Sequence, residues 1–432
     1  MSVSIAKKRN CDKQQNFDCL TGETKQICIP IEKTEYEEVT GNPKKFRGKL
    51  DEIIKKYPEI FPEEIENGYW LQDILPKSKK LPDLTVRRVK ITKTDEVYTI
   101  LPSFVMRYMT AYASDVEKAM FLRHFNVPYW ALTFVFGKND MFWYRIENQI
   151  GRNSIVGTTI KKPENLPDHT LADEKFSRQN SQQVYLPLVT SSDCILGIKV
   201  VTQVDHLSLI SAYGDFKKEA QNVDPEYQPK TCTSDGWKAT RWAWKMLFPS
   251  TTLILCFFHS FMKIRDCFYS IQQHYQELSS KVWDAYHSPD FASFSTALSD
   301  LKSWATLHIS CKKARKAVYK LCDKVSLFAP AYSFPSSYRT TAHLDRIMDS
   351  QDRFLYSRKY FHGHFSSAQY SVRAWAILRN FSPYSPQFSL SKQFLSPAHR
   401  INGFVYHENW FQNLLVSSSM GGFRPTPQKT LQ

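Results

Sequence analysis

The stretch that most constrains how this chain can fold is residues 231–267. Its pattern predicts four elements in order: a short strand (231–234), a turn (235–237), a helix (238–248) and a wholly apolar strand (251–258). Pro249 ends the helix, because proline has no amide hydrogen to continue the hydrogen-bond ladder. Cys256 and His259 stand at the end of the apolar strand. Strand, helix and buried strand in this order are typical of βαβ units, whose polar groups gather at strand ends.

Asp235 follows the first of these strands and precedes a glycine and the helix. Taken alone, it would be interpreted as a helix N-cap, because aspartate accepts hydrogen bonds from the first amides of a helix. Two more aspartates favour a second interpretation. Asp173 lies at the end of an expected upstream strand, and Asp345 lies downstream on an expected helix. Three converging carboxylates repel one another unless cations neutralise them, and oxygen ligands suit Mg²⁺ or Mn²⁺.

The order of these motifs resembles that of DDE transposases of the Mutator-like type and their bacterial insertion-sequence relatives. Those proteins carry an Asp-Gly-x-x-Ala helix, a Phe-Pro step and a short apolar strand that ends in Cys-x-x-His. The matching segments of this chain are 235–239, 248–249 and 256–259. The resemblance covers roughly residues 165–380, about half of the chain at ordinary domain sizes. Each motif is short, and their order and spacing make the resemblance specific.

The expected elements upstream of Asp235 point to the same architecture. They are three strands (165–174, 183–190 and 194–202), a helix (207–220) and a fourth strand (230–234). This is the element order of the RNase H-like fold, which places one acid on its first strand and another after its fourth. Asp173 and Asp235 occupy those places. We therefore expect a mixed α/β fold with an RNase H-like catalytic core, interrupted by an all-helical insertion, after an N-terminal helical DNA-binding region.

The third acid is expected on a helix that closes the site. In the resembled family it follows the second residue of a Thr-Thr pair by four positions, which corresponds to Thr341 and Asp345 here. Relatives more often have glutamate at this position. Asp349 and Asp352 lie on the same helix face and are alternatives for the third ligand. The alternative is a structural role, in which these aspartates form ion pairs with arginines of the same helix.

The resemblance implies that the three aspartates hold two Mg²⁺ (or Mn²⁺) ions and support DNA strand cleavage followed by strand transfer. Cys256 and His259 are only two ligands and do not make a zinc site. We expect both to shape the core beside Asp235, with His259 contacting the scissile DNA. Lys238 opens the helix after the second acid and is expected to contact a phosphate.

The charge of the chain favours a polyanionic partner. Its formal net charge is +15, and Lys and Arg that neutralise phosphates supply most non-specific affinity for nucleic acid. A hairpin at 87–91 and 97–101 precedes helices expected at 113–125, 129–136 and 141–150. Helices joined by such short turns favour a helix-turn-helix-like element, and an ordinary helical bundle is the alternative. The candidate DNA contacts are Arg123, Lys138, Arg145 and Arg152.

We expect the whole chain to divide into six parts. They are a mobile polar leader (1–45), a DNA-binding region (46–160), the first part of the core (161–264), the insertion (265–335), the closing helix (336–380) and an irregular tail (381–432) with one short helix near 410–417. Nine cysteines without regular spacing favour a reducing compartment. Cys11, Cys19 and Cys28 lack the C-x-x-C spacing of a zinc site. No signal peptide or membrane span is expected, which favours a cytoplasmic or nucleoid-associated protein.

The leading hypothesis is a DDE-type transposase of an insertion sequence. Its partners would be double-stranded DNA at the transposon ends and at the target, and a second copy of the chain. One alternative is a non-catalytic DNA-binding protein, such as a decayed transposase that acts as a repressor. Another is an RNase H-like nuclease that cuts DNA without joining it.

Overall fold

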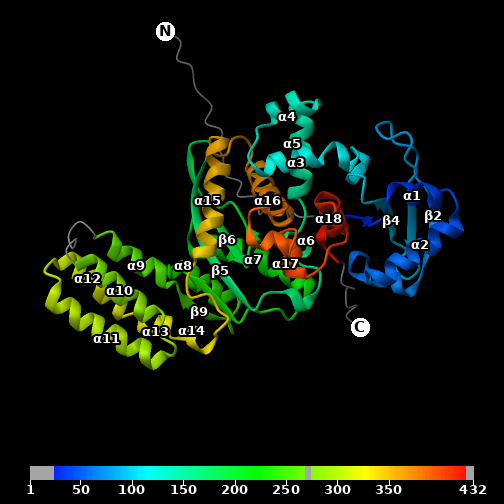
Figure 1. Ribbon diagram of the computed structural model, residues 1–432. Helices are drawn as coiled ribbons and strands as arrows, with labels where there is room; N and C mark the ends of the chain where they lie inside the picture. The colour runs from blue at the N-terminus through cyan, green and yellow to red at the C-terminus, as the bar shows by residue number, and fades with distance from the viewer. Residues whose placement is uncertain (1–23, 268–273, 425–432) are drawn as a thin grey trace, which may run out of the picture.

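The computed structural model describes residues 24–267 and 274–424, a mixed α/β protein (Figure 1). A five-stranded sheet lies at the centre of the molecule. A smaller unit with a four-stranded sheet lies on one side of it, and a bundle of helices lies on the other (Figure 1). The central sheet therefore joins two peripheral parts of the chain.

The central sheet has the strand order β7-β6-β5-β8-β9. Its strands are β5 (His169–Gln179), β6 (Gln182–Ser191), β7 (Cys194–Ile198), β8 (Thr231–Ser234) and β9 (Thr252–Leu255). The first three are antiparallel neighbours, while β8 and β9 run parallel to β5. Asn180 and Ser181 join β5 to β6 with positive φ angles of 47° and 66°. Such a two-residue turn matches the twist of paired strands and holds them in register.

Helices cover both faces of this sheet. On one face Leu171 and Leu188 belong to a hydrophobic cluster shared with α15 (Ala342–Ser357) and α16 (Phe365–Phe381). On the other face Ala172 and Val189 pack in a cluster with α7 (His206–Val223) and α8 (Lys238–Leu247). Successive residues of a strand point to opposite faces. The two faces of β5 are therefore set by alternation, and Asp173 lies on the same face as Leu171.

The N-terminal unit contains a mixed sheet of order β1-β4-β3-β2. Its strands are β1 (Gln26–Ile29), β2 (Tyr69–Ile74), β3 (Arg87–Ile91) and β4 (Val97–Pro102), and its helices are α1 (Lys33–Thr40) and α2 (Pro43–Lys56). The expected hairpin at 87–91 and 97–101 is confirmed, since β3 and β4 pair antiparallel. Three helices connect this unit to the central sheet: α3 (Glu117–His124), α4 (Tyr129–Phe136) and α5 (Asp140–Gly151).

A buried ion pair links three helices around the central sheet. Glu219 of α7 accepts hydrogen bonds from the amides of Ile155 and Val156, at 2.6 and 3.0 Å, in the first turn of α6 (Ile155–Thr159). Its other oxygen lies 2.5 Å from the guanidinium of Arg373 on α16. Glu219 and Arg373 are 4% and 3% exposed. A buried charge is tolerated only with such complete pairing.

The helical bundle lies between β9 and α15 in the chain. Its helices are α9 (Phe257–Arg265), α10 (Tyr275–Tyr286), α11 (Phe291–His308), α12 (Lys312–Cys322), α13 (Val325–Phe328) and α14 (Pro330–Ser333). They enclose their own hydrophobic cluster, which includes Phe257, Phe294 and Phe328. An all-helical segment at 265–335 was expected, but the helices begin earlier, at Phe257.

Two expected irregular segments are corrected by the structure. Residues 24–45 of the expected leader contain β1, α1 and the start of α2, because buried Ile27 and Ile29 complete the edge of the N-terminal sheet. The expected irregular tail contains α17 (Pro397–Asn402), which was not expected, while α18 (Trp410–Ser417) confirms the short helix expected at 410–417. Ser419 accepts a hydrogen bond from the amide of Cys28, which ties this tail to β1. Residues 1–23, including Cys11 and Cys19, lie outside the described part, as do 425–432.

Two strand ends also differ from expectation. Strand β5 continues to Gln179, so Asp173 lies in its middle and not at its end, because the long hairpin with β6 extends the strand. Strand β9 ends at Leu255, so His259 lies in the first turn of α9 and not at a strand end. The buried phenylalanines after Cys256 pack in the helical bundle, and this packing favours a helix there.

The ion pair of Glu219 and Arg373 gives a test of this core. Replacing Glu219 by Ala leaves the buried guanidinium and two helix amides without their acceptor. We expect the free energy of unfolding to fall by about 3–5 kcal/mol in urea titrations. The control is Glu277→Ala, which breaks an exposed pair with Lys281 and should cost less than about 0.5 kcal/mol. Equal effects of the two variants would contradict the role of the buried pair.

Candidate functional site

The register of β5 and β8 places two aspartates side by side. Leu171 on β5 pairs with Thr233 on β8, and both strands run in the same direction. Two residues further along the chain come Asp173, in the middle of β5, and Asp235, in the turn that follows β8. The turn after β8 depends on Gly236, whose φ is +87° and whose added Cβ would lie 2.3 Å from Leu255 Cδ1. This turn holds Asp235 at the sheet edge.

Asp235 also takes part in the local hydrogen bonding expected of a helix start. One carboxylate oxygen accepts the amide of Trp237 at 2.8 Å, and Trp237 is the N-cap of α8. Among the described residues, the structure has no side chain that donates to the second carboxylate oxygen of Asp235. Asp235 can therefore support the turn with one oxygen and offer the other as a ligand.

Helix α15 brings the third aspartate to the same place. Thr341, the N-cap of α15, is fully buried, and its Oγ1 lies 3.3 Å from Cys256 Sγ and 3.2 Å from His259 Nδ1. Its amide donates to the same sulfur at 3.3 Å. One turn later, the amide of Asp345 donates to the carbonyl of Thr341 at 2.9 Å. Cys256 and His259 thus anchor the helix that carries Asp345.

A second contact holds the first turn of α15 from its other side. His343 Nδ1 lies 3.8 Å from a carboxylate oxygen of Asp193, in the turn between β6 and β7. Arg400 binds the second oxygen of Asp193 at 2.6 Å. The nearby His343 ring, together with Arg400, lowers the pKa of Asp193 to about 2. Asp193 therefore stays ionised and restrains the residue two positions before Asp345.

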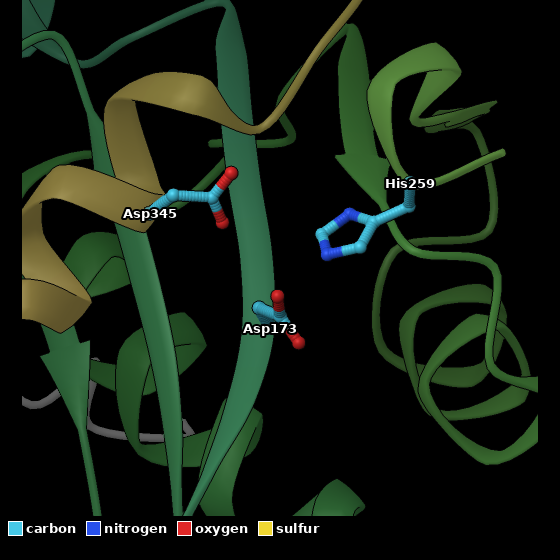
Figure 2. Close-up of side chains that lie close together, drawn as sticks. All are labelled: Asp173, His259 and Asp345. Carbon is cyan, nitrogen blue, oxygen red and sulfur yellow. The ribbon is translucent and has the colours of Figure 1, made fainter. Parts of the chain in front are cut away.

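Asp173, His259 and Asp345 form one cluster, shown in Figure 2. One ligand atom from each lies within 4.8 Å of the others. The two carboxyl groups and the imidazole ring point toward a common space between β5, α15 and α9 (Figure 2). Oxygen and nitrogen donors at such distances can hold a divalent cation.

The electrostatics of the cluster favour a positive charge at its centre. Burial raises the pKa of Asp173 to about 6, and the charge of Asp235 adds to this rise. Burial also raises the pKa of Asp345. A hydrogen bond with Cys256, together with the nearby carboxylates, raises the pKa of His259 to about 9. At neutral pH the imidazolium therefore faces carboxylates that repel one another, and a bound cation would relieve that repulsion further.

The neighbouring acid, Glu174, lies on the opposite face of β5, as alternation predicts. Its carboxylate accepts the hydroxyls of Tyr213 on α7 and Thr240 on α8, at 2.5 and 2.6 Å. Burial raises the pKa of Glu174 to about 7. Glu174 therefore supports the sheet from beneath the cluster and is not among its ligands.

The structure distinguishes among the three aspartates of α15. Asp352 binds Lys175 of β5 at 2.7 Å, and Asp349 is exposed. Asp345 alone of the three belongs to the cluster with Asp173 and His259. The shorter side chain of aspartate reaches the other ligands from this position on the helix.

One expected DNA contact is wrong. Arg123 is 6% exposed and forms a buried ion pair with Glu147, and its guanidinium also lies 4.5 Å from the ring centre of Tyr129. A side chain that neutralises a buried acid cannot reach a phosphate at the surface. The apolar character of the surrounding helices is the sequence signal that could have indicated this burial.

The other expected DNA contacts lie at the surface. Lys138, Arg145, Arg152 and Lys238 are exposed. Helix α4, however, presents exposed apolar side chains, with Trp130 at 66% and Phe134 at 86%. A helix that contacts phosphates or base edges usually exposes polar and basic side chains instead. DNA binding by this region stays a prediction.

His259 lies closer to the acids than its place in the sequence indicates. It was expected to shape the core and contact DNA, whereas its ring belongs to the cluster of candidate metal ligands. The signal that could have indicated this is its place one turn into a helix that follows the strand beside Asp235.

No known family model matches this chain, and a search of curated proteins finds no similar sequence. Among the helices of the described residues, none has both the length and the apolar character needed to span a membrane.

The raised pKa of Glu174 predicts a pH-dependent stability. The ordinary pKa is 4.5, so the folded protein holds this proton up to about pH 7. The stability from the neutral carboxyl is fully present below pH 4.5 and is lost as the pH rises through 7. Glu174→Gln cannot ionise and keeps an acceptor oxygen. We expect it to match wild type at pH 4 and to exceed its free energy of unfolding by about 1–3 kcal/mol at pH 8.

Urea titrations at both pH values, with a chelator present, measure this difference. The exposed Glu226→Gln is the matched control and should show no such pH dependence. A Glu174→Gln difference that is the same at pH 4 and pH 8 would show that the pKa of Glu174 in the folded protein equals its value in the unfolded chain.

Proposed function

We propose that this protein is a DDE-type DNA transposase, which cleaves DNA strands at transposon ends and joins them to target DNA. The observation that carries the proposal is the approach of Asp345 to Asp173, within 4.8 Å, beside Asp235 at the next strand. The three acids come from β5, the turn after β8, and α15. Carboxylates held this close repel one another, and a bound cation relieves that repulsion.

The sheet supports the proposal. Three antiparallel strands followed by two parallel ones, with an acid on the central strand and another after its parallel neighbour, agree with an RNase H-like core. The helical bundle between β9 and α15 agrees with an insertion between the second and third acids. The net charge of +15 suits DNA as the substrate.

The donor set fits divalent cations. Asp173, Asp235 and Asp345 offer carboxylate oxygens, which suit two Mg²⁺ or Mn²⁺ ions. When bound, such ions lower the pKa of an attacking water or 3′-hydroxyl and stabilise the leaving oxygen of a phosphodiester. The like charge of Asp173 and Asp235, together with burial of Asp173, gives the site its preference for cations.

Two basic side chains would complete the contact with DNA. His259 carries a proton at neutral pH and, beside the acids, can donate it in a hydrogen bond to a non-bridging oxygen of the scissile phosphate. Lys238 is exposed at the first position of α8, next to the turn of Asp235, and would bind a flanking phosphate. Both side chains would hold the DNA backbone in place, and neither would transfer a proton.

The proposal predicts that each acid is essential. Asp173→Asn, Asp235→Asn and Asp345→Asn should each lower Mg²⁺-dependent cleavage by more than about 100-fold, because an amide binds a cation far more weakly than a carboxylate. The measurement is cutting of a DNA that carries the inverted repeats flanking this element. Asp349→Asn is the matched control on the same helix and should cut like wild type, and a chelator should stop cutting.

The products distinguish the competing functions. Joined DNA ends in the same reaction support a transposase, whereas cutting without joining indicates an RNase H-like nuclease. Binding without cutting by wild type would favour a non-catalytic DNA-binding protein. If Asp345→Asn cuts normally and Asp349→Asn does not, the third acid is Asp349.

A further inference from the structure

Helix α12 of the helical bundle presents a face of lysines to the surface. Its sequence, KKARKAVYKLC, contains five basic residues and no acid. The apolar side chains Ala314, Val318 and Leu321 are buried against the bundle. Opposite them, four lysines are exposed: Lys312, Lys313, Lys316 and Lys320. Helical periodicity thus gathers these charges on the side away from the bundle core.

These lysines have no acidic partner in the structure. In residues 24–267 and 274–424, none of the four lies within ion-pair distance of a carboxylate. Other lysines of the same bundle are paired: Lys302 binds Asp323 at 2.6 Å, and Lys281 binds Glu277 at 3.6 Å. Solvated surface lysines usually alternate with acids on a helix face. A face of like charges raises the local potential and attracts anions.

The lysine face leads toward the acidic cluster. Helix α12 packs against α9, and Lys324 lies two residues after Cys322, the last residue of α12. Helix α13, which begins at the next residue, packs against β9 beside the turn of Asp235. Lys263 stands one helical turn after His259 on α9, so the two share a helix face. The basic surface of the bundle therefore continues to the edge of the candidate active site.

The spacing suits an extended polyanion. Lys312, Lys316 and Lys320 are four residues apart, which separates neighbours by about 6 Å along the helix and spans about 12 Å in total. A DNA duplex carries one negative charge per ~1.7 Å of its axis. Several phosphates can therefore approach these lysines at once, whereas a small anion would use only one or two of them.

We propose that this lysine face of α12 (Lys312, Lys316 and Lys320), continued by Lys263 and Lys324, binds the phosphate backbone of a DNA duplex and directs it to Asp235. The proposal rests on the proposed function, since it assigns the DNA of that reaction a path across the helical bundle. It makes the bundle a binding surface and not only a spacer between two acids.

The test is the salt dependence of DNA binding. The triple variant Lys312→Gln, Lys316→Gln and Lys320→Gln, in the full chain, is compared with wild type on a fluorescent 40-base-pair duplex of arbitrary sequence. Each lost phosphate contact removes ~0.9 from the slope of log affinity against log salt concentration. We expect the slope to fall by about 2–3 and the affinity at 0.1 M NaCl to fall by about 10-fold or more.

The matched control is Lys44→Gln, Lys45→Gln and Lys55→Gln on α2. These lysines are also exposed on a helix and removing them changes the net charge equally. The control should keep the wild-type slope, and thermal unfolding should show that both variants fold. Equal slopes for wild type and the α12 variant would overturn the proposal. An equal loss in both variants would also overturn it, because the effect would then be one of net charge.

The inference and the proposed function fail separately. If wild type cuts DNA and the α12 variant binds and cuts like wild type, only the inference fails. If the α12 variant shows the expected weaker salt dependence of DNA binding but wild type never cuts DNA with Mg²⁺, the transposase proposal fails. The DNA-binding surface then stands. A duplex of RNA bound more tightly than DNA, with the same loss in the variant, would overturn DNA as the ligand.

Discussion

Two aspartates, one on β5 and one in the turn after its parallel neighbour β8, are the constraint on which the rest of this structure depends. The pairing of β5 with β8 brings Asp235 near Asp173, whose pKa is raised by burial and by the charge of Asp235. Such an arrangement is unfavourable by itself. The surrounding elements supply positive charge, from His259 on α9 and from Lys324.

The approach of α15 depends on a contact between segments far apart in the chain. Thr341 binds Cys256 and His259, and Asp193 restrains His343 from the other side. The chain leaves the sheet at Cys256, passes through the whole helical bundle, and returns at Thr341 beside the residue where it left. The bundle can therefore carry its own core and its own charged surface without disturbing the acids.

Local patterns predicted much of this site. The strand, turn and helix around Asp235, and the position of Asp345 after Thr341, depend on residues close in sequence, and the structure has them in place. The wrong expectations all depended on distant contacts. Arg123 was taken for a surface residue because its partner, Glu147, lies on another helix. The N-terminal segment and most of the C-terminal segment were expected to be irregular, but they pack together, which composition alone does not indicate.

The central claim is that three aspartates and the space between them form a site for divalent cations. Anomalous diffraction from crystals soaked in MnCl₂ tests it most directly, because manganese is located without any assay of activity. The account predicts density for Mn²⁺ at about 2.0–2.6 Å from carboxylate oxygens of Asp173, Asp235 and Asp345. Density elsewhere, or none at this cluster while Mn²⁺ saturates other sites, would contradict it.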